Sequence, residues 1–158
     1  MARDATARLY DVDEDSVVFN RLDKTKSYDQ GEVQFKARKG KLIDLDKLHE
    51  SIWASRLSGG TRSGLVSLRV TAIGKIVTTN GRTILQVNGS KAEFTLGNTS
   101  NAKQAAAFTR LTVTSGDVVV QVTGLIDNYR GRWPEVLGRK PQRTRRILVT
   151  GFKAVAEK

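Results

Sequence analysis

The chain contains no cysteine, only two prolines and only one histidine, His49, in 158 residues. Without cysteine it cannot form a disulfide, hold zinc or an iron–sulfur cluster through thiolates, or use a cysteine nucleophile. A single imidazole also argues against a histidine metal site or a Ser-His-Asp triad. The sequence therefore predicts a protein without metal, cofactor or catalytic residues, which is a binder and not an enzyme.

Long apolar runs are also absent. No stretch approaches the roughly 18 residues that a membrane-spanning helix needs, and the amino-terminal residues lack the apolar core of a signal peptide. Hydrophobic residues nevertheless make up 39% of the chain, which is enough to build a packed core. We expect a soluble, folded chain, and its location and oligomeric state stay open.

Positive charge is distributed unevenly along the chain. Residues 1–63 hold 12 Lys and Arg against 11 Asp and Glu, whereas residues 64–158 hold 15 against 5. Between them, the glycine-rich stretch Ser58-Gly59-Gly60-Thr61-Arg62-Ser63-Gly64 interrupts the apolar pattern. The sequence predicts two units, 1–63 and 64–158, and the second carries almost all of the net charge of +11.

The first unit is predicted to contain two strands and a helix. Residues 15–22 and 31–37 are typical of strands, and the second alternates apolar and polar side chains. The acidic residues between 11 and 15 lack the glycine and glutamate of a calcium loop, so we interpret them as a solvated turn. Helical spacing of apolar residues after a capping aspartate predicts a helix within residues 42–57, from Asp44 with Leu45, Leu48 and Ile52.

This order of elements resembles a known family. The strand, turn, strand and helix of residues 16–57, with the helix sequence Ile43-Asp44-Leu45-Asp46-Lys47-Leu48-His49-Glu50-Ser51-Ile52, are similar to the latter half of a heavy-metal-associated, ferredoxin-like domain. That family holds its metal in a Cys-x-x-Cys loop before its first helix. Because this chain lacks those cysteines, the resemblance implies no metal binding.

The second unit changes to a strand-rich pattern. Asn80-Gly81 between two β-rich segments is a strong signal for a hairpin. Three consecutive alanines near Phe108 favour a short helix. The expected order is three strands, a helix and two strands, at residues 65–77, 82–87, 91–96, 101–111, 117–126 and 146–155.

Residues 65–156 resemble the OB-fold family of oligonucleotide- and oligosaccharide-binding barrels. The resemblance is carried by the strand order, by the helix between the third and fourth strands, and by Val122-Thr123-Gly124 within the fourth. It implies a five-stranded, partly open barrel. The expected fold class is therefore mainly β, with an OB-like barrel preceded by a small strand-strand-helix unit.

The segment from residue 127 to residue 146, which joins the last two strands, is the strongest candidate site. It holds seven Lys and Arg against two acids, together with Tyr129 and Trp133. Cations that displace counterions from phosphates and rings that stack on bases are what nucleic-acid binding needs. The predicted nucleic-acid-binding residues are Tyr129, Arg130, Arg132, Trp133, Arg139, Lys140, Arg143, Arg145 and Arg146, supported by Arg69, Lys75, Arg82, Lys91 and Arg110.

These features predict a non-enzymatic nucleic-acid-binding protein. The first three barrel strands offer only one aromatic residue, Phe94, which disfavours a dedicated single-strand binder and leaves duplex DNA and structured RNA open. The alternative is an interaction or assembly module whose basic barrel binds an acidic protein, lipid or polysaccharide surface.

Overall fold

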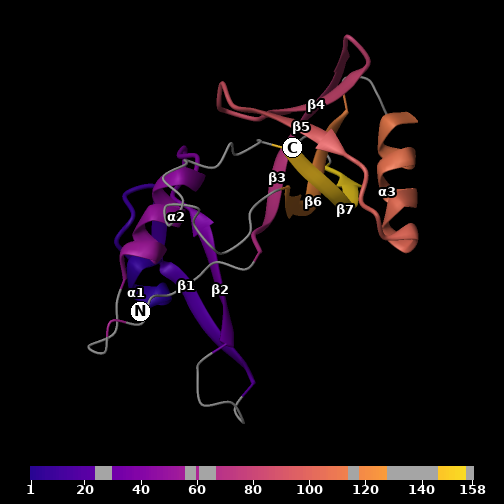
Figure 1. Cartoon of the computed structure of the whole chain (residues 1–158). Helices are drawn as coiled ribbons and strands as arrows, with labels where there is room; N and C mark the ends of the chain where they lie inside the picture. Colours follow the sequence, from indigo (N-terminus) through magenta and orange to yellow (C-terminus); the bar gives the residue numbers. More distant parts are fainter. Residues whose placement is uncertain (24–29, 56–59, 61–66, 114–117, 128–145, 156–158) are drawn as a thin grey trace, which may run out of the picture. The chain divides into compact units, whose positions relative to one another are not determined.

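The computed structural model describes residues 1–23, 30–55, 60, 67–113, 118–127 and 146–155. Residue contacts divide the chain into two compact units, Met1–Leu65 and Val66–Lys158. Figure 1 colours the first unit from indigo to magenta and the second from rose to yellow. The seam expected at residues 58–64 lies outside the described residues except for Gly60.

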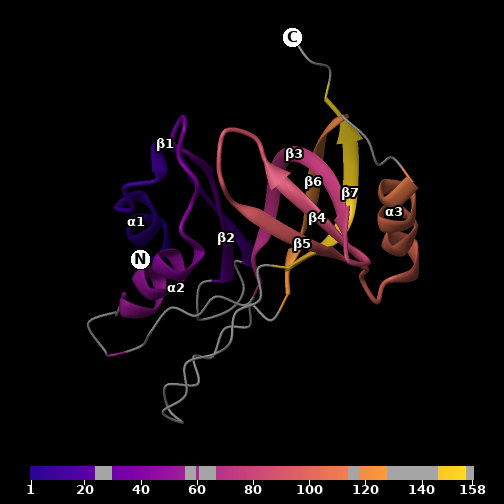
Figure 2. The same cartoon turned by 90° about the horizontal axis from the view of Figure 1, so that it is seen from above.

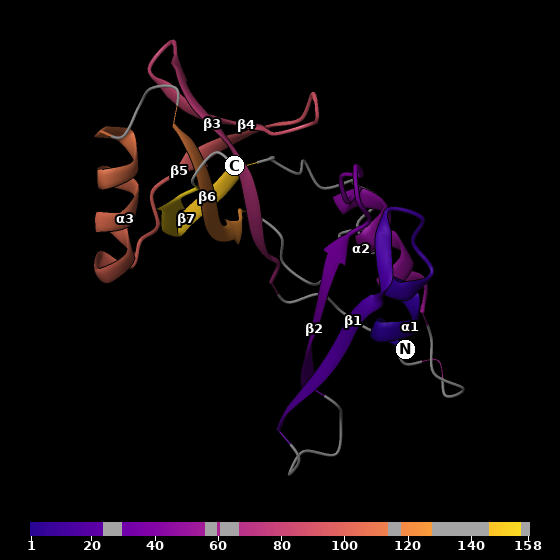
Figure 3. The same ribbon diagram turned by 180° about the vertical axis from the view of Figure 1, so that it is seen from behind.

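The first unit consists of α1 (Ala2–Ala7), β1 (Val12–Asp23), β2 (Gln30–Ala37) and α2 (Leu45–Ala54). The strands pair antiparallel as a long hairpin, which Figure 3 shows from behind. Both expected strands and the expected helix are present. Helix α1 was not expected, because its six residues are too few to show an amphipathic period.

The interpretation of the acidic residues as a turn was wrong, because Asp13, Glu14 and Asp15 lie within β1. Their neighbours Val12 and Val17 are buried, and this packing holds the intervening residues extended. The β1–β2 ladder shifts register after Asp13, and there the hydroxyl of Ser16 takes part in hydrogen bonds with backbone groups of both strands. It accepts from the Lys36 N–H at 2.8 Å and donates to the Asp13 carbonyl at 2.6 Å.

Helix α2 begins where the sequence predicts. The Asp44 carboxylate accepts hydrogen bonds from the N–H groups of Asp46 and Lys47 at 3.0 and 3.1 Å, so it caps the first turn. Leu48 and Ile52 are buried one turn apart. The apolar face of α2 therefore anchors the core of the first unit.

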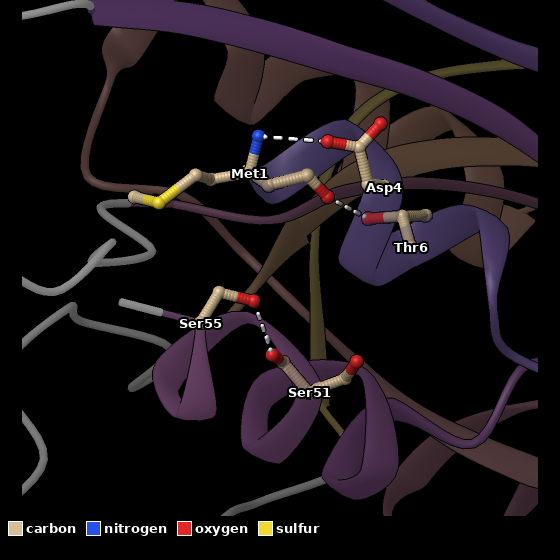
Figure 4. Close-up of polar contacts among 6 residues, drawn as sticks. Met1, Asp4, Thr6, Ser51 and Ser55 are labelled. Carbon is tan, nitrogen blue, oxygen red and sulfur yellow. Dashed lines mark hydrogen bonds and ion pairs between the residues drawn. The ribbon is translucent and has the colours of Figure 1, made fainter. Parts of the chain in front are cut away.

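Short polar contacts stabilise helices α1 and α2, and Figure 4 shows those that lie within each helix. Ser51 Oγ donates to the Ala5 carbonyl at 2.8 Å, and Ser55 Oγ donates to the Ser51 carbonyl at 3.0 Å. Thr6 is fully buried, and its hydroxyl donates a hydrogen bond to the Ala2 carbonyl at 2.9 Å. At the start of α1, the terminal ammonium hydrogen-bonds Asp4 at 3.0 Å and lowers the pKa of that carboxyl.

The described part of the second unit contains one helix and five strands. They are β3 (Arg69–Thr79), β4 (Arg82–Val87), β5 (Glu93–Gly97), α3 (Ala102–Val113), β6 (Val119–Ile126) and β7 (Arg146–Ala154). The strands pair in the order β3-β4-β5-β7-β6, and β3 also pairs with β6, which closes the barrel. Only the β5–β7 pair is parallel among the described ladders.

Alternating side chains fill the interior of the second unit. Leu85, Val120, Val122, Ile147 and Val149 are fully buried from three strands. Helix α3 packs against β7 (Figure 2). The expected order of three strands, helix and two strands is confirmed, and so is the mainly β character of the chain.

Two glycines allow the strands to approach closely. A Cβ added at Gly74 would lie 2.0 Å from the Gln86 carbonyl oxygen, and one at Gly124 would lie 2.4 Å from the Leu148 carbonyl oxygen. At both positions backbone of the neighbouring strand occupies the space. Gly124 is the last residue of the Val122-Thr123-Gly124 sequence, and the close neighbouring strand leaves no room for a side chain at this position.

Within the described residues, no helix combines the length and the apolar character that crossing a bilayer requires.

Candidate functional site

An open pocket of about 700 Å³ lies on the second unit. It is bordered by the β3–β4 turn, strands β4 and β5, helix α3, and the residues at the end of β6 and the start of β7. We call it the barrel pocket. Its lining residues are Gly81, Arg82, Thr83, Ile84, Glu93, Thr95, Leu96, Phe108, Asp127 and Arg146.

Strand alternation and pairing align three of the side chains that line the barrel pocket. On β4, Leu85 is buried, whereas its neighbour Ile84 is half-buried on the opposite face. Ile84 pairs with Thr95 of β5, and Thr95 pairs with Arg146 of β7. Since paired residues point to the same side of a sheet, these three side chains form one row across the pocket.

The β3–β4 turn places Arg82 at the rim of the pocket. Asn80 and Gly81 both have positive φ, at 52° and 71°, which is the backbone of the tight hairpin expected for Asn-Gly. Thr79 and Arg82 close the ladder beside the turn. Arg82 is exposed, and no ion pair of this residue is found within the described part of the chain.

Asp127 and Arg146 form the base of the segment that joins β6 to β7. Arg146 Nε donates to Asp127 Oδ2 at 2.8 Å, a second guanidinium nitrogen pairs with the same oxygen, and the Asp127 N–H donates to the Arg146 carbonyl at 2.9 Å. The side chain of Arg146 is 48% exposed and that of Asp127 only 17%. The carboxylate therefore orients the guanidinium and partly neutralises its charge.

A second acid in the barrel pocket is also engaged. Glu93 Oε1 accepts a hydrogen bond from Gln86 Nε2 at 3.0 Å across the β4–β5 pair. The described lining thus carries two arginines and two acids, which leaves the pocket close to neutral. Any strong attraction for a polyanion must come from cations beyond the described lining.

The structure describes only one of the nine predicted nucleic-acid-binding residues. Arg146 lies in the barrel pocket. The remaining predicted residues fall outside the described residues: Tyr129, Arg130, Arg132, Trp133, Arg139, Lys140, Arg143 and Arg145. Of the supporting cations, Arg82 is among the lining residues, whereas Arg69, Lys75, Lys91 and Arg110 are not.

Several lining residues were not selected from the sequence. Ile84 and Thr95 could have been found from the alternation within residues 82–87 and 91–96, once these strands are recognised as neighbours. Phe108, on α3, carries no such signal, because its place at the pocket depends on how the helix packs. Phe94 is only 7% exposed, so the aromatic residue expected on the first three strands belongs to the core.

The described residues offer no grouping of three His, Asp or Glu side chains suited to a metal ion. His49 is buried on α2 in the first unit and does not line the barrel pocket.

Comparisons with protein-family models, with curated proteins and with solved structures found no match for this chain. The fold and the pocket themselves therefore carry the functional inference.

Proposed function

We propose that the chain is a non-enzymatic nucleic-acid-binding protein whose second unit is an OB-like barrel. OB-folds take their ligands on the second and third strands and in the loops that join strands one to two and four to five. In this chain those strands are β4 and β5, and the barrel pocket lies on them. The pocket also reaches the turn at Gly81 and both ends of the β6–β7 connection.

The observation that carries the proposal is the position of Asp127 and Arg146. Both line the barrel pocket, so the two described residues that flank segment 128–145 in the sequence lie at the pocket. That segment holds six Lys and Arg against one acid, Glu135, together with Tyr129 and Trp133. Cations bind phosphates and aromatic rings stack on bases, so the composition of this segment suits a nucleic-acid ligand.

The nearly neutral pocket offers hydrogen-bond donors to a nucleic-acid backbone that cations elsewhere attract. Its strand residues contribute the Arg82 guanidinium and the Thr95 hydroxyl, which can donate hydrogen bonds to phosphate oxygens. The strand part of the lining contains no aromatic residue, so base stacking falls to Tyr129 and Trp133. We expect binding that depends strongly on salt and weakly on sequence.

The test is fluorescence polarisation of the full chain with labelled single-stranded DNA, duplex DNA and RNA across a range of salt concentrations. Log affinity should fall linearly with log salt, by about 0.7 per phosphate contact on single strands and about 0.9 on duplex DNA. A sulfated polysaccharide and an acidic polypeptide serve as competitors. If either binds more tightly than every oligonucleotide at equal salt, the protein is an interaction module for acidic surfaces instead.

Arg82→Gln examines the barrel pocket itself, and Lys91→Gln is its matched control. Both residues are exposed cations of the second unit, but only Arg82 is in the pocket lining. Arg82→Gln should flatten the salt dependence by about one phosphate contact, or roughly 0.7 to 0.9. Equal effects of the two changes would show that general charge, and not the pocket, determines binding.

A further inference from the structure

A second basic surface lies on the first unit, around an exposed tyrosine. The Tyr10 side chain is 71% exposed. The Arg38 guanidinium carbon lies 5.4 Å from the centre of its ring, and Lys41 Nζ lies 5.0 Å from the same centre. Lys39 is exposed between them in the sequence. We call these four residues, Tyr10, Arg38, Lys39 and Lys41, the Tyr10 cluster.

Backbone hydrogen bonds hold the Tyr10 cluster together. The Lys41 N–H donates to the Arg38 carbonyl at 2.8 Å, and Gly40 has a φ of 73°, so the chain turns tightly between the two cations. The Arg38 N–H donates to the Asp11 carbonyl at 2.8 Å, which ties the turn to the residue after Tyr10. The ring and both cationic groups are thus brought together before any ligand arrives.

The cationic groups of the Tyr10 cluster form no ion pair with Asp11 or Asp44, whose carboxylates accept backbone hydrogen bonds. Asp11 Oδ2 accepts a hydrogen bond from the Asp44 N–H, and the Asp44 carboxylate caps α2. Neither Arg38 nor Lys41 forms an ion pair with any residue that the structure describes. The Arg38 guanidinium donates a hydrogen bond only to a neutral group, the Val12 carbonyl, at 3.4 Å among the described residues. The first unit is nearly neutral as a whole, with 12 cations and 11 acids, so this concentration of unpaired cations is local.

We propose that the Tyr10 cluster is a second contact for the phosphate backbone of the nucleic acid. This proposal rests on the nucleic-acid-binding function proposed above. Cations beside an exposed aromatic ring are the combination by which proteins follow a nucleic-acid strand. The ring restrains the two long side chains, so less conformational freedom is lost when they meet phosphates. Two contacts on one chain also strengthen binding through effective concentration.

An anionic membrane is the main competing partner. Leu42, next to Lys41, is 39% exposed and could enter a lipid interface. However, the more exposed aliphatic side chains of the unit, Val18 and Leu22, belong to β1 and not to the cluster. Apolar surface and cations are therefore not gathered on the same segment, which favours a strand of phosphates over a bilayer.

The experiment compares four full-length proteins by polarisation with a labelled single-stranded oligonucleotide across salt concentrations. They are the wild type, a cluster variant with Arg38→Gln and Lys41→Gln, a barrel variant with Arg143→Gln and Arg145→Gln, and the combination. The cluster variant should lower the salt slope by about 1.4, which corresponds to two contacts, and the combined variant should show the sum of both reductions.

The matched control is Lys36→Gln with Lys47→Gln, which removes the same charge from exposed positions of the first unit outside the cluster. Its salt slope should stay near that of the wild type. A second pair tests the ring: Tyr10→Phe keeps the face that holds the cations and should retain affinity, whereas Tyr10→Leu should weaken binding. Circular dichroism verifies that each variant is folded.

Each outcome separates the two proposals. If the cluster variant behaves like its control while the barrel variant weakens binding, the second contact is refuted and the barrel function stands. If only the cluster variant weakens binding, the barrel function is refuted instead. If no oligonucleotide binds the wild type, both fail. If the cluster variant loses affinity for vesicles containing phosphatidylserine but not for oligonucleotides, the cluster is a membrane contact and the second-contact proposal is refuted.

Discussion

The two units enclose their apolar side chains in different ways. In the second unit each strand pairs with two neighbours, and the closed ladder surrounds a core that includes Leu85, Val122 and Ile147. In the first unit the sheet has only two strands, and Val18 and Leu22 remain 51% and 68% exposed. A two-stranded sheet depends on helices for its stability, because a hairpin alone buries too little surface.

The units also differ in charge, and the difference separates possible roles. The first unit holds nearly equal numbers of cations and acids, and within its described residues the Tyr10 cluster gathers unpaired cations beside an aromatic ring. The second unit carries ten more cations than acids over residues 64–158. General attraction for a polyanion should therefore come from the barrel, and the first unit should add a local contact. Four predictions test how the two units differ in binding and in stability.

The largest effect is expected from separating the units. A fragment of residues 64–158 should keep most of the free energy of oligonucleotide binding, whereas a fragment of residues 1–63 should keep little, because the excess charge is in the second unit. Polarisation measures both affinities. A folded barrel fragment, verified by circular dichroism, that binds no oligonucleotide would contradict the assignment of roles.

Neutralising three arginines at the end of the β6–β7 connection should have the next largest effect. Replacing Arg143, Arg145 and Arg146 with Gln should weaken binding to every sequence and flatten the salt slope by roughly 0.7 to 0.9 per lost contact. Because Arg146 is partly neutralised by Asp127, its share should be the smallest of the three. Affinities measured for single variants at several salt concentrations check this order.

Gly124→Ala should destabilise the barrel without affecting the first unit. The added Cβ would meet the Ile147 side chain and the Leu148 carbonyl at 2.4 Å, and such overpacking costs about 1 to 3 kcal/mol. Trp53, on α2, reports the first unit by fluorescence in a Trp133→Phe background. Far-UV circular dichroism follows the barrel strands.

Gly151→Ala is the matched control for this change. Gly151 lies on the neighbouring strand β7, and nothing lies within 4 Å of a Cβ added there. Its stability should stay within about 1 kcal/mol of the wild type. If both glycine variants lower the unfolding midpoint equally, the close strand contact at Gly124 is not the cause of the lost stability.

The smallest effect is expected at the cap of α2. Asp44→Ala should lower the stability of the first unit by about 0.5 to 2 kcal/mol, because two helix N–H groups lose their acceptor. Asp44→Asn should restore most of the loss, since asparagine caps nearly as well without the charge. Denaturation followed by Trp53 fluorescence measures both. Equal losses for the two variants would assign the effect to the negative charge.

The local sequence determined most of the elements. Asn80-Gly81 predicted a hairpin because both residues tolerate positive φ, and Asp44 predicted the start of α2 because its carboxylate accepts backbone N–H groups. Turn signals beside β-rich segments predicted β4 and β5. These signals act within a few residues, so they can be recognised without knowing the fold.

Of the site, the sequence indicated the basic character of the β6–β7 connection and the candidate Arg82. It could not show that Asp127 holds Arg146 or that Phe108 lies at the same pocket, because these residues come from separate elements. It also misjudged the acidic residues at the start of β1. Their extended backbone depends on the burial of Val12 and Val17, which lies outside any local pattern.

The sequence by itself determined the order of every element after α1 and the concentration of positive charge in the second unit, because composition and short-range patterns encode these properties. Only the tertiary structure decided that β3 pairs with β6, that Thr95 stands between Ile84 and Arg146, and that Tyr10 lies beside Arg38 and Lys41. Those contacts join residues far apart in the chain. They exist because burial of the apolar faces brings the elements together.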